Sequence, residues 1–325
     1  MLKKIVLGCV FALVFAVSLF PGGRAEGPAS VVVYPIDIVA TTGMVGDIVA
    51  NVVGTNGSVF VLMDDEIDPH LFRPTRADIA RMQRADMIFY NGLNLEGQMG
   101  DTLVQLARTR PVFAVTELVE EFVLLEDEDY EGAFDPHLWM DVSLWMEAVE
   151  VVVLALSEFD PAGAEYYRSN ADAYLAELEE LDAYVREVLA SIPAARRFLV
   201  TAHDAFGYLG VAYGLEVIGV QGLSTESEAG LEDINSLVSF LVENQISAVF
   251  AETTVADRAL MAVIEGAASR GHQVAIGGEL FSDAMGPAGT WEGTYIGMMD
   301  HNATTIAQAL GGSAPPRGFR GRLAP

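Results

Sequence analysis

The chain has 325 residues, is 51% hydrophobic and carries a formal net charge of −28 at pH 7. This length and apolar content suffice for one large core or two smaller ones, and 20% charged residues exclude a disordered or fibrous protein. The acidic excess argues against nucleic acid or an anionic membrane surface as the main partner, because both would repel the chain.

The N-terminus has the pattern of an export signal. Lys3 and Lys4 precede the apolar run Ile5–Phe20, and the small residue Ala25 fits a signal-peptidase site. The run is short for a membrane span. We therefore predict a signal peptide over residues 1–25 and a periplasmic or extracytoplasmic protein.

Cys9, the only cysteine, lies inside this segment. Val6–Cys9 looks like a lipoprotein box, but cleavage there would leave almost no apolar run, so we treat the match as chance. An uncleaved N-terminal anchor is the alternative. The mature chain then has no disulfide, no thiolate metal ligand and no cysteine nucleophile.

After the signal, short β-branched runs alternate with helical patterns, which is typical of α/β units on parallel sheets. The first strands are expected at Ile36–Ala40, Val59–Met63, Met87–Tyr90 and Val112–Val115. Helices are expected at Gly43–Val53, Leu95–Ala107 and Ser143 to about Ser157. Another helix is expected to begin with a capping box formed by Thr75 and Asp78 and to end at Arg84.

A longer helical pattern follows, from Pro161 to Ser191, with apolar residues on one side and acids on the other. At 1.5 Å per residue it spans about 45 Å, longer than most helices of globular domains. One long amphipathic helix midway through an α/β chain indicates a connection between two lobes.

The alternation then resumes. Strands are expected at Phe198–Thr201, Glu216–Val220, Ala248–Ala251 and Val274–Ile276. Helices are expected at about Ala205–Tyr213, Leu231–Asn244, Asp257–Arg270 and Gly293–Leu310. The sequence therefore predicts an α/β fold with two lobes, each a mostly parallel sheet flanked by helices, joined by one long rigid helix. The predicted division is a signal peptide (1–25), an N-terminal lobe (26–160), a linking helix (161–192), a C-terminal lobe (193–311) and a disordered tail (312–325).

Two of the five histidines share a context. Residues 68–72 and 135–139 both read Asp-Pro-His-Leu followed by an aromatic residue. Proline stiffens each turn, and each aspartate could take the free ring N–H of its histidine, as metal-binding histidines require. In a chain this poor in histidine we favour His70 and His137 as metal ligands over two coincident turns.

Two further candidates follow strands, where ligands of α/β proteins gather. His203 comes after Phe198–Thr201, although Asp204 could instead cap the next helix and leave His203 exposed. Near the last strand, Asp283 or Glu279 could supply a carboxylate oxygen. We expect His272 to be a surface residue and His301 to be structural.

Three neutral imidazoles and one carboxylate suit Zn²⁺ when the carboxylate binds through one oxygen, and Mn²⁺ or Fe²⁺ when it binds through both. Catalytic signatures are missing from the sequence, including His-Glu-x-x-His, Gly-x-Ser-x-Gly and a P-loop. The candidate ligands come from four distant segments, two in each lobe, which favours clamping an ion over catalysis.

The motifs identify a resemblance. DPHLWMD at Asp135–Asp141, TAHDAFGYLGVAYGL at Thr201–Leu215 and the stretch from Gly271 to Asn302 resemble the zinc- and manganese-binding solute-binding proteins of ABC importers, the cluster A-I family, and its TroA-like members above all. The resemblance covers nearly all of the mature chain. It implies a non-enzymatic monomer that holds one Zn²⁺ or Mn²⁺ between two lobes through His70, His137, His203 and Asp283, and delivers it to a membrane permease.

Metal identity stays open between zinc and manganese. Some manganese-type relatives have glutamate where this chain has His203, which disfavours a manganese-only site. Dedicated zinc relatives often carry a His-rich loop before the second ligand, where this chain has the acidic stretch Glu126–Glu131. The alternatives are a zinc hydrolase with an open coordination position and a binding protein for a larger metal chelate. On an adhesin role the sequence is silent.

Overall fold

The computed structural model describes residues 32–127 and 132–324. The expected signal peptide and most of the acidic stretch Glu126–Glu131 lie outside the described residues. One compact unit begins at Val33 and runs to the C-terminus, and the elements below all belong to it. Within the described ranges, no helix combines the length and the hydropathy needed to cross a bilayer.

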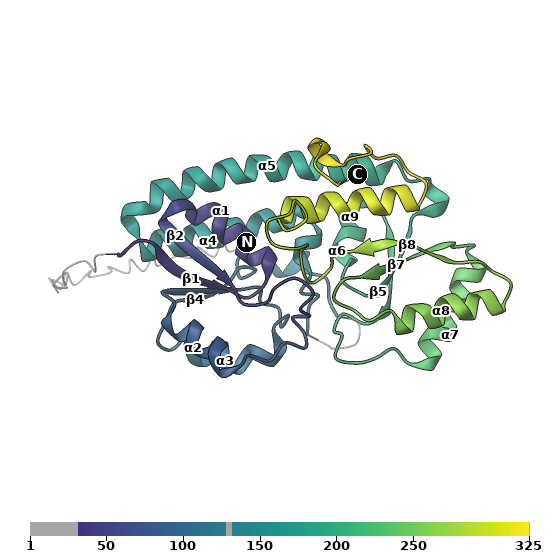
Figure 1. The fold of residues 1–325 in the computed structure, drawn as a ribbon, viewed down its shortest axis with the longest axis horizontal. Coiled ribbons are helices and arrows are strands. Elements are labelled where there is room, and N and C mark those ends of the chain that lie inside the picture. Colours follow the sequence, from purple (N-terminus) through teal and green to yellow (C-terminus); the bar gives the residue numbers. More distant parts are fainter. Residues whose placement is uncertain (1–31, 128–131, 325) are drawn as a thin grey trace, which may run out of the picture. The chain divides into compact units, whose positions relative to one another are not determined.

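The first lobe is built on a parallel sheet of four strands in the order β2-β1-β3-β4. They are β1 (Ile36–Ala40), β2 (Gly57–Val61), β3 (Met87–Tyr90) and β4 (Val112–Ala114). The central strands β1 and β3 consist almost entirely of buried apolar residues, as expected when helices cover both faces of a sheet. The layered arrangement is visible in Figure 1.

The helices of this lobe are α1 (Gly43–Val53), α2 (Arg76–Arg84), α3 (Gly100–Leu106) and α4 (Val142–Phe159). The predicted capping box of α2 is present: the Thr75 hydroxyl accepts from the backbone N–H of Asp78, and the Asp78 carboxylate accepts from that of Thr75. The predicted bounds of β1, α1 and β3 are confirmed.

Three predicted elements in this lobe have bounds that differ from the structure by two residues or more. The β2 strand starts and ends two residues before the expected Val59–Met63. The helix expected from Leu95 begins only at Gly100, after a 3-10 turn, because the positive φ of Asn94 turns the chain first. Helix α4 is capped by Asp141 rather than Ser143, since the Asp141 carboxylate accepts from the backbone N–H of Ser143 at 2.8 Å.

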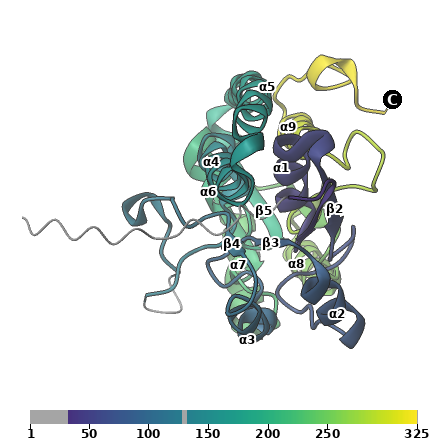
Figure 2. The same cartoon turned by 90° about the vertical axis from the view of Figure 1, so that its left-hand side faces the viewer.

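The long helix α5 (Ala164–Ala190) has 27 residues and follows a 3-10 turn at Pro161–Gly163. It packs against α1 and α4 of the first lobe and against α6 and α9 of the second. Figures 1 and 2 both show it running beside α1 and α9. The chain therefore has the predicted architecture of two α/β lobes joined by one long helix.

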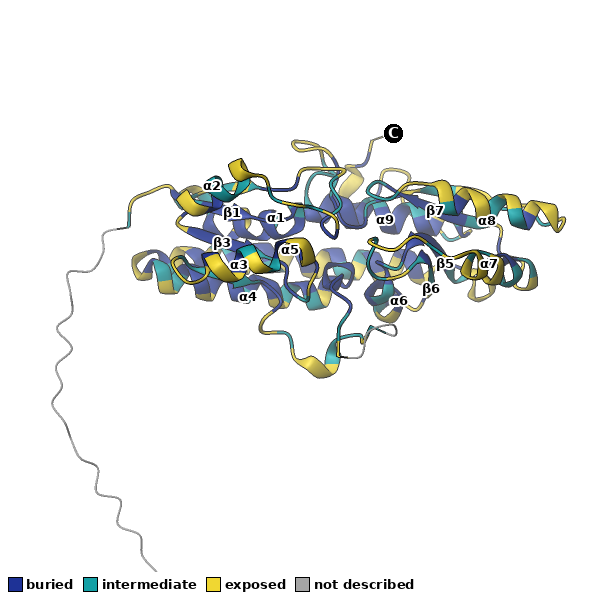
Figure 3. Cartoon of the chain, turned by 90° about the horizontal axis from the view of Figure 1, so that it is seen from below, coloured by how far each residue is buried: buried dark blue, intermediate teal, exposed yellow. Residues whose placement is uncertain are grey.

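The second lobe repeats the plan with the strand order β6-β5-β7-β8, again all parallel. Its strands are β5 (Phe198–His203), β6 (Glu216–Gln221), β7 (Ala248–Glu252) and β8 (Ala275–Leu280). Its helices are α6 (Gly207–Tyr213), α7 (Leu231–Glu243), α8 (Arg258–Ser269) and α9 (Tyr295–Ala309). Figure 3 shows α9 largely buried, whereas α7 and α8 have exposed outer faces.

Strand β8 extends four residues beyond the predicted end at Ile276, through two glycines that read as a loop in the sequence. The structure explains these glycines by close packing against α9. A Cβ on Gly278 would collide with the side chain of Thr305, and one on Gly277 would lie 2.9 Å from Ala309 Cβ. The glycines let the helix approach the sheet and do not end the strand.

The tail is ordered up to residue 324, so the predicted disorder of residues 312–325 is wrong for the part that the structure describes. Phe319, in a 3-10 turn, is only 7% exposed and lies against Tyr184 of α5. Its backbone N–H donates to the Asp300 carboxylate at 2.7 Å. Composition indicated disorder, but two apolar residues of the tail, Phe319 and Leu323, are buried, and Phe319 packs against the long helix.

Candidate metal centre

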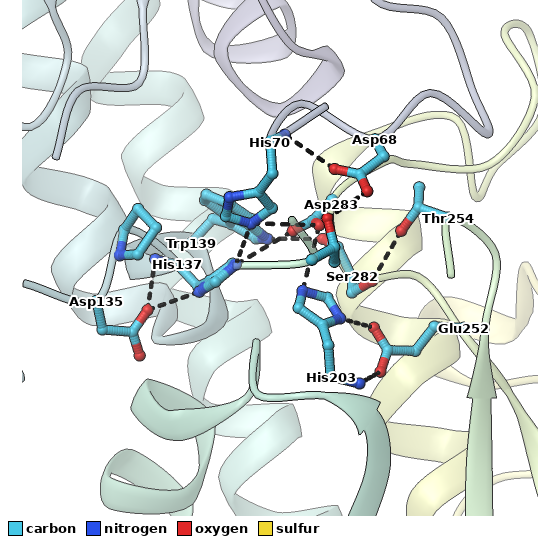
Figure 4. Close-up of polar contacts among 12 residues, drawn as sticks. Asp68, His70, Asp135, His137, Trp139, His203, Glu252, Thr254, Ser282 and Asp283 are labelled. Carbon is cyan, nitrogen blue, oxygen red and sulfur yellow. Dashed lines mark hydrogen bonds and ion pairs between the residues drawn. The ribbon is translucent and has the colours of Figure 1, made fainter. Parts of the chain in front are cut away.

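The structure brings the four predicted side chains together. One potential ligand atom from each of His70, His137, His203 and Asp283 lies within 4.8 Å of the others, and all four residues are buried. His70 lies in the loop after β2, and His137 precedes the turn that leads into α4. His203 is the last residue of β5, and Asp283 follows β8. Each lobe thus contributes two residues (Figure 4).

The three imidazoles direct their Nε2 atoms at one carboxylate. Asp283 Oδ1 lies 3.3 Å from His137 Nε2, and Asp283 Oδ2 lies 3.2 Å from His203 Nε2 and 3.7 Å from His70 Nε2. Within the described chain, neither Asp283 oxygen nor His203 Nε2 has a hydrogen-bond partner. Unsatisfied buried polar atoms are rare and costly. A cation among these atoms would satisfy all three, so the donor set fits a metal ion.

Two of the histidines have fixed ring orientations. Asp135 lies 2.6 Å from His137 Nδ1, and Glu252 lies 2.5 Å from His203 Nδ1. Each carboxylate also accepts the backbone N–H of the histidine that it orients. With Nδ1 donating to a carboxylate, the Nε2 lone pair is directed into the cluster, which is the tautomer that a metal requires.

Glu252 was missed in the sequence, although Asp135 was predicted. The available signal was its position: it follows directly on the predicted strand Ala248–Ala251, at the carboxyl end where site residues gather. Its partner His203 ends β5, which pairs with β7 in the sheet. The neighbouring strand therefore places the carboxylate beside the ring.

Asp68 does not play the part that was predicted for it. It was expected to accept the ring N–H of His70, but its Oδ1 accepts the backbone N–H of His70 at 2.8 Å instead. The two Asp-Pro-His segments thus share a turn in which aspartate binds the histidine backbone. Only the second segment adds a bond to the ring, because only Asp135 also reaches Nδ1.

The cluster perturbs the pKa of each member. Burial lowers the pKa of His70 to about 3, outweighing the attraction of the Asp283 charge. Burial acts in the same direction on His137, but the charges of Asp135 and Asp283 outweigh it and raise its pKa to about 9. Glu252 and Asp283 likewise hold the pKa of His203 well above its usual value against burial. Burial opposes ionisation of Asp283, but the three histidines keep its pKa well below the usual range.

The remaining candidates lie apart from the cluster. Glu279, the alternative to Asp283, is an exposed residue of β8. The ring of His272 contacts the carbonyl of Ile246, and the ring of His301 contacts that of Glu279. Helix α6 begins at Gly207, so Asp204 does not cap it. His272 is partly buried rather than a surface residue, and neither His272 nor His301 belongs to the cluster, which contains Asp283 and not Glu279.

Two parallel sheets of the same build, with a buried three-histidine, one-aspartate cluster between them, define a two-lobed protein with a candidate metal centre. Residues 38–309 match the family model described as zinc-uptake complex component A, periplasmic. The chain therefore belongs to this family, and the predicted resemblance to the cluster A-I, TroA-like proteins is confirmed.

Individual relatives agree with this assignment. The manganese-binding lipoprotein MntA of Bacillus subtilis (strain 168) is 41% identical over 303 residues, which cover 93% of this chain and 99% of MntA. The metal ABC transporter substrate-binding lipoprotein SloC of Streptococcus mutans is 30% identical, with coverages of 85% and 90%. The solved structure of the periplasmic zinc-binding protein TroA from Treponema pallidum superposes with a TM-score of 0.82 at 44% identity, with coverages of 84% and 98%.

Proposed function

We propose that this protein captures one divalent transition-metal ion outside the cytoplasm and delivers it to the membrane permease of an ABC importer. The observation that carries the proposal is the buried cluster of His70, His137, His203 and Asp283, whose carboxylate oxygens have no hydrogen-bond partner among the described residues. The description of the family model as a zinc-uptake component supports import, and the name of SloC, a substrate-binding lipoprotein of a metal ABC transporter, supports a transporter as the partner.

Zn²⁺ and Mn²⁺ are the proposed substrates, with one ion per chain. Three imidazoles with a carboxylate suit Zn²⁺ in tetrahedral geometry, and a bidentate Asp283 would add the oxygen ligand that Mn²⁺ favours. The relatives support both ions, because MntA is named for manganese and TroA for zinc.

An acidic cleft offers the ion a route to the cluster. The cleft has a volume of about 720 Å³ and is lined by His70 and by residues of both lobes. Its acidic lining residues are Asp127, Asp204, Glu226, Glu228 and Asp233. Carboxylates in a cleft raise the local concentration of cations, so this lining supports entry past His70.

Capture requires the ligands to give up protons. The neighbouring carboxylates raise the pKa of His137 and of His203 against the effect of burial, so a proton competes with the ion for these rings. Binding of the ion is therefore coupled to proton release, as is usual for metal sites. Asp135 and Glu252 then keep the deprotonated Nε2 atoms aimed at the ion.

Hydrolysis with the same ligands is less well supported. A catalytic zinc site keeps an open coordination position for water and substrate. Here three of the four residues are at most 2% exposed and His70 is 5% exposed, which favours a protein that encloses an ion. We also propose that the lobes at 26–160 and 193–311, linked by residues 161–192, are the units that hold the ion between them.

Export rests on the N-terminal pattern of residues 1–25 and on the lipoprotein names of MntA and SloC. Because these relatives are lipoproteins, we also propose lipidation at Cys9, the last residue of the lipoprotein box, as a candidate membrane anchor. Mass spectrometry of the N-terminus of the mature protein distinguishes cleavage after Ala25, lipidation at Cys9 and retention of the whole segment.

The proposed function is tested by elemental analysis of the protein as isolated, followed by competitive titration of the metal-free protein with Zn²⁺ and Mn²⁺. We expect one ion per chain and tight binding of at least one of the two metals. A protein that binds neither ion stoichiometrically, or that hydrolyses ester, amide or phosphate substrates only when metal is present, would contradict the proposal.

A further inference from the structure

A loop of the second lobe reaches across the cleft to the turn that carries His70. The loop comprises residues 222–230, between β6 and α7. The Thr225 hydroxyl donates to Asp68 Oδ2 in the first lobe at 2.5 Å. A second bond lies beside it, in which the Gln98 side-chain amide donates to the Glu226 carboxylate. The loop is therefore bound to the opposite lobe at two neighbouring points.

Asp68 connects this loop to a candidate ligand. Its Oδ2 accepts from Thr225, and its Oδ1 accepts the backbone N–H of His70 at 2.8 Å. Pro69, between them, fixes its own φ and restricts Asp68 to extended geometry. The Asp68 carboxylate is thus hydrogen-bonded to both Thr225 and the backbone of His70, so the position of Thr225 affects that of His70.

His70 depends on this connection more than the other histidines do. The rings of His137 and His203 are held by Asp135 and Glu252 through Nδ1. For His70, the described residues supply no such bond to Nδ1, and His70 borders the cleft. Its placement therefore follows from the turn at Asp68.

We infer that Thr225 is a positioning residue, which holds His70 against the other three ligands by fixing Asp68 while loop 222–230 crosses the cleft. The inference rests on the proposed function and deepens it. Separation of the lobes on this side breaks the bond between Thr225 and Asp68, frees the His70 turn and opens the cleft. The bond therefore sets how long a captured ion is retained.

The test is the rate at which the Zn²⁺-loaded protein loses its ion to an excess of chelator. Thr225→Val keeps the shape of the side chain but removes the donor, which leaves Asp68 Oδ2 without this partner. We expect release to be faster by about tenfold, the lower end of the effect of residues that orient a metal ligand. Thr225→Ser keeps the hydroxyl and should release at nearly the unsubstituted rate. Ser227→Ala, at an exposed position of the same loop, is the matched control and should change nothing.

A purely structural role for Thr225 would lower the thermal stability of the metal-free protein equally in Thr225→Val and Thr225→Ser, and this result would overturn the inference. So would an unchanged release rate in Thr225→Val. Failure of the unsubstituted protein to bind either Zn²⁺ or Mn²⁺ would overturn the proposed function as well. Stoichiometric binding by all variants with identical release rates would overturn the role of Thr225 alone.

Discussion

The indole N–H of Trp139 donates a 2.9 Å hydrogen bond to the backbone carbonyl of Ser282. Trp139 comes two residues after His137, and Ser282 comes directly before Asp283. Both residues are fully buried, and the indole ring also lies edge-on to the ring of His137. The bond therefore joins the two segments that bring candidate ligands from opposite lobes.

Trp139→Phe should lower the free energy of unfolding of the metal-free protein by about 1–3 kcal/mol, because it leaves the buried carbonyl of Ser282 without its donor. Trp145→Phe is the matched control: Trp145 is equally buried, but its Nε1 has no hydrogen-bond partner in the described chain. Chemical denaturation of both variants measures the difference. Equal losses would show that the bond to Ser282 adds nothing beyond the volume of the indole.

His137→Ala should abolish stoichiometric metal binding. It removes an imidazole that faces Asp283 at 3.3 Å and leaves the Asp135 carboxylate without its ring partner. We expect a loss of affinity greater than ~100-fold, beyond the range for residues that only orient a ligand. His272→Ala, which changes a histidine outside the cluster, should bind one ion as before. If equilibrium dialysis shows that His137→Ala still retains one tightly held ion, this result would contradict the four-ligand site.

Glu252→Gln should weaken metal binding by roughly 10–100-fold without abolishing it. Glutamine keeps the length of the side chain but replaces the charge that orients His203 through Nδ1. The exposed Glu279 provides the control, because Glu279→Gln removes an equal charge from the same lobe without touching the cluster. Competitive titration against a chelator gives both affinities. If the two variants bind equally well, Glu252 does not tune the site.

Local patterns predicted most of the fold. The apolar runs that form β1, α1 and β3, and the turn residues that delimit them, are local features of the sequence, so these elements were predicted with the bounds that the structure shows. The candidate ligands were predicted for a related reason. The turn that presents His137, and the strand that ends at His203, are each encoded in a few consecutive residues.

Contacts between distant segments could not be predicted in this way. Glu252 meets His203 only because β5 and β7 are neighbours in the sheet, an order that no local pattern specifies. Thr225 meets Asp68 only when the two lobes face each other. The prediction for the tail was wrong for the same reason. Its composition favours disorder, but Phe319 is buried through contacts with α5 and α9, which are distant in the sequence.

Metal removal should destabilise the protein. An ion that binds only the folded state adds RT ln(1 + [L]/Kd), which is about 2.7 kcal/mol at a free concentration of roughly 100 Kd. We therefore expect the Tm to fall when a chelator strips the ion and to recover when Zn²⁺ is restored. The His137→Ala variant should show no such dependence. A Tm that is the same with and without metal in the unsubstituted protein would contradict selective binding by the folded state.

Phe319→Ala should destabilise the protein by about 3 kcal/mol, the lower end of the cost of truncating a buried phenylalanine. Phe319 is 7% exposed and packs against Tyr184, so its removal leaves a cavity between the tail and the long helix. Phe122 is 82% exposed, and Phe122→Ala should change the stability by less than ~0.5 kcal/mol. Urea denaturation of the two variants compares the same truncation at a buried and an exposed site. Equal stability of the two would mean that the tail does not pack against α5 in solution.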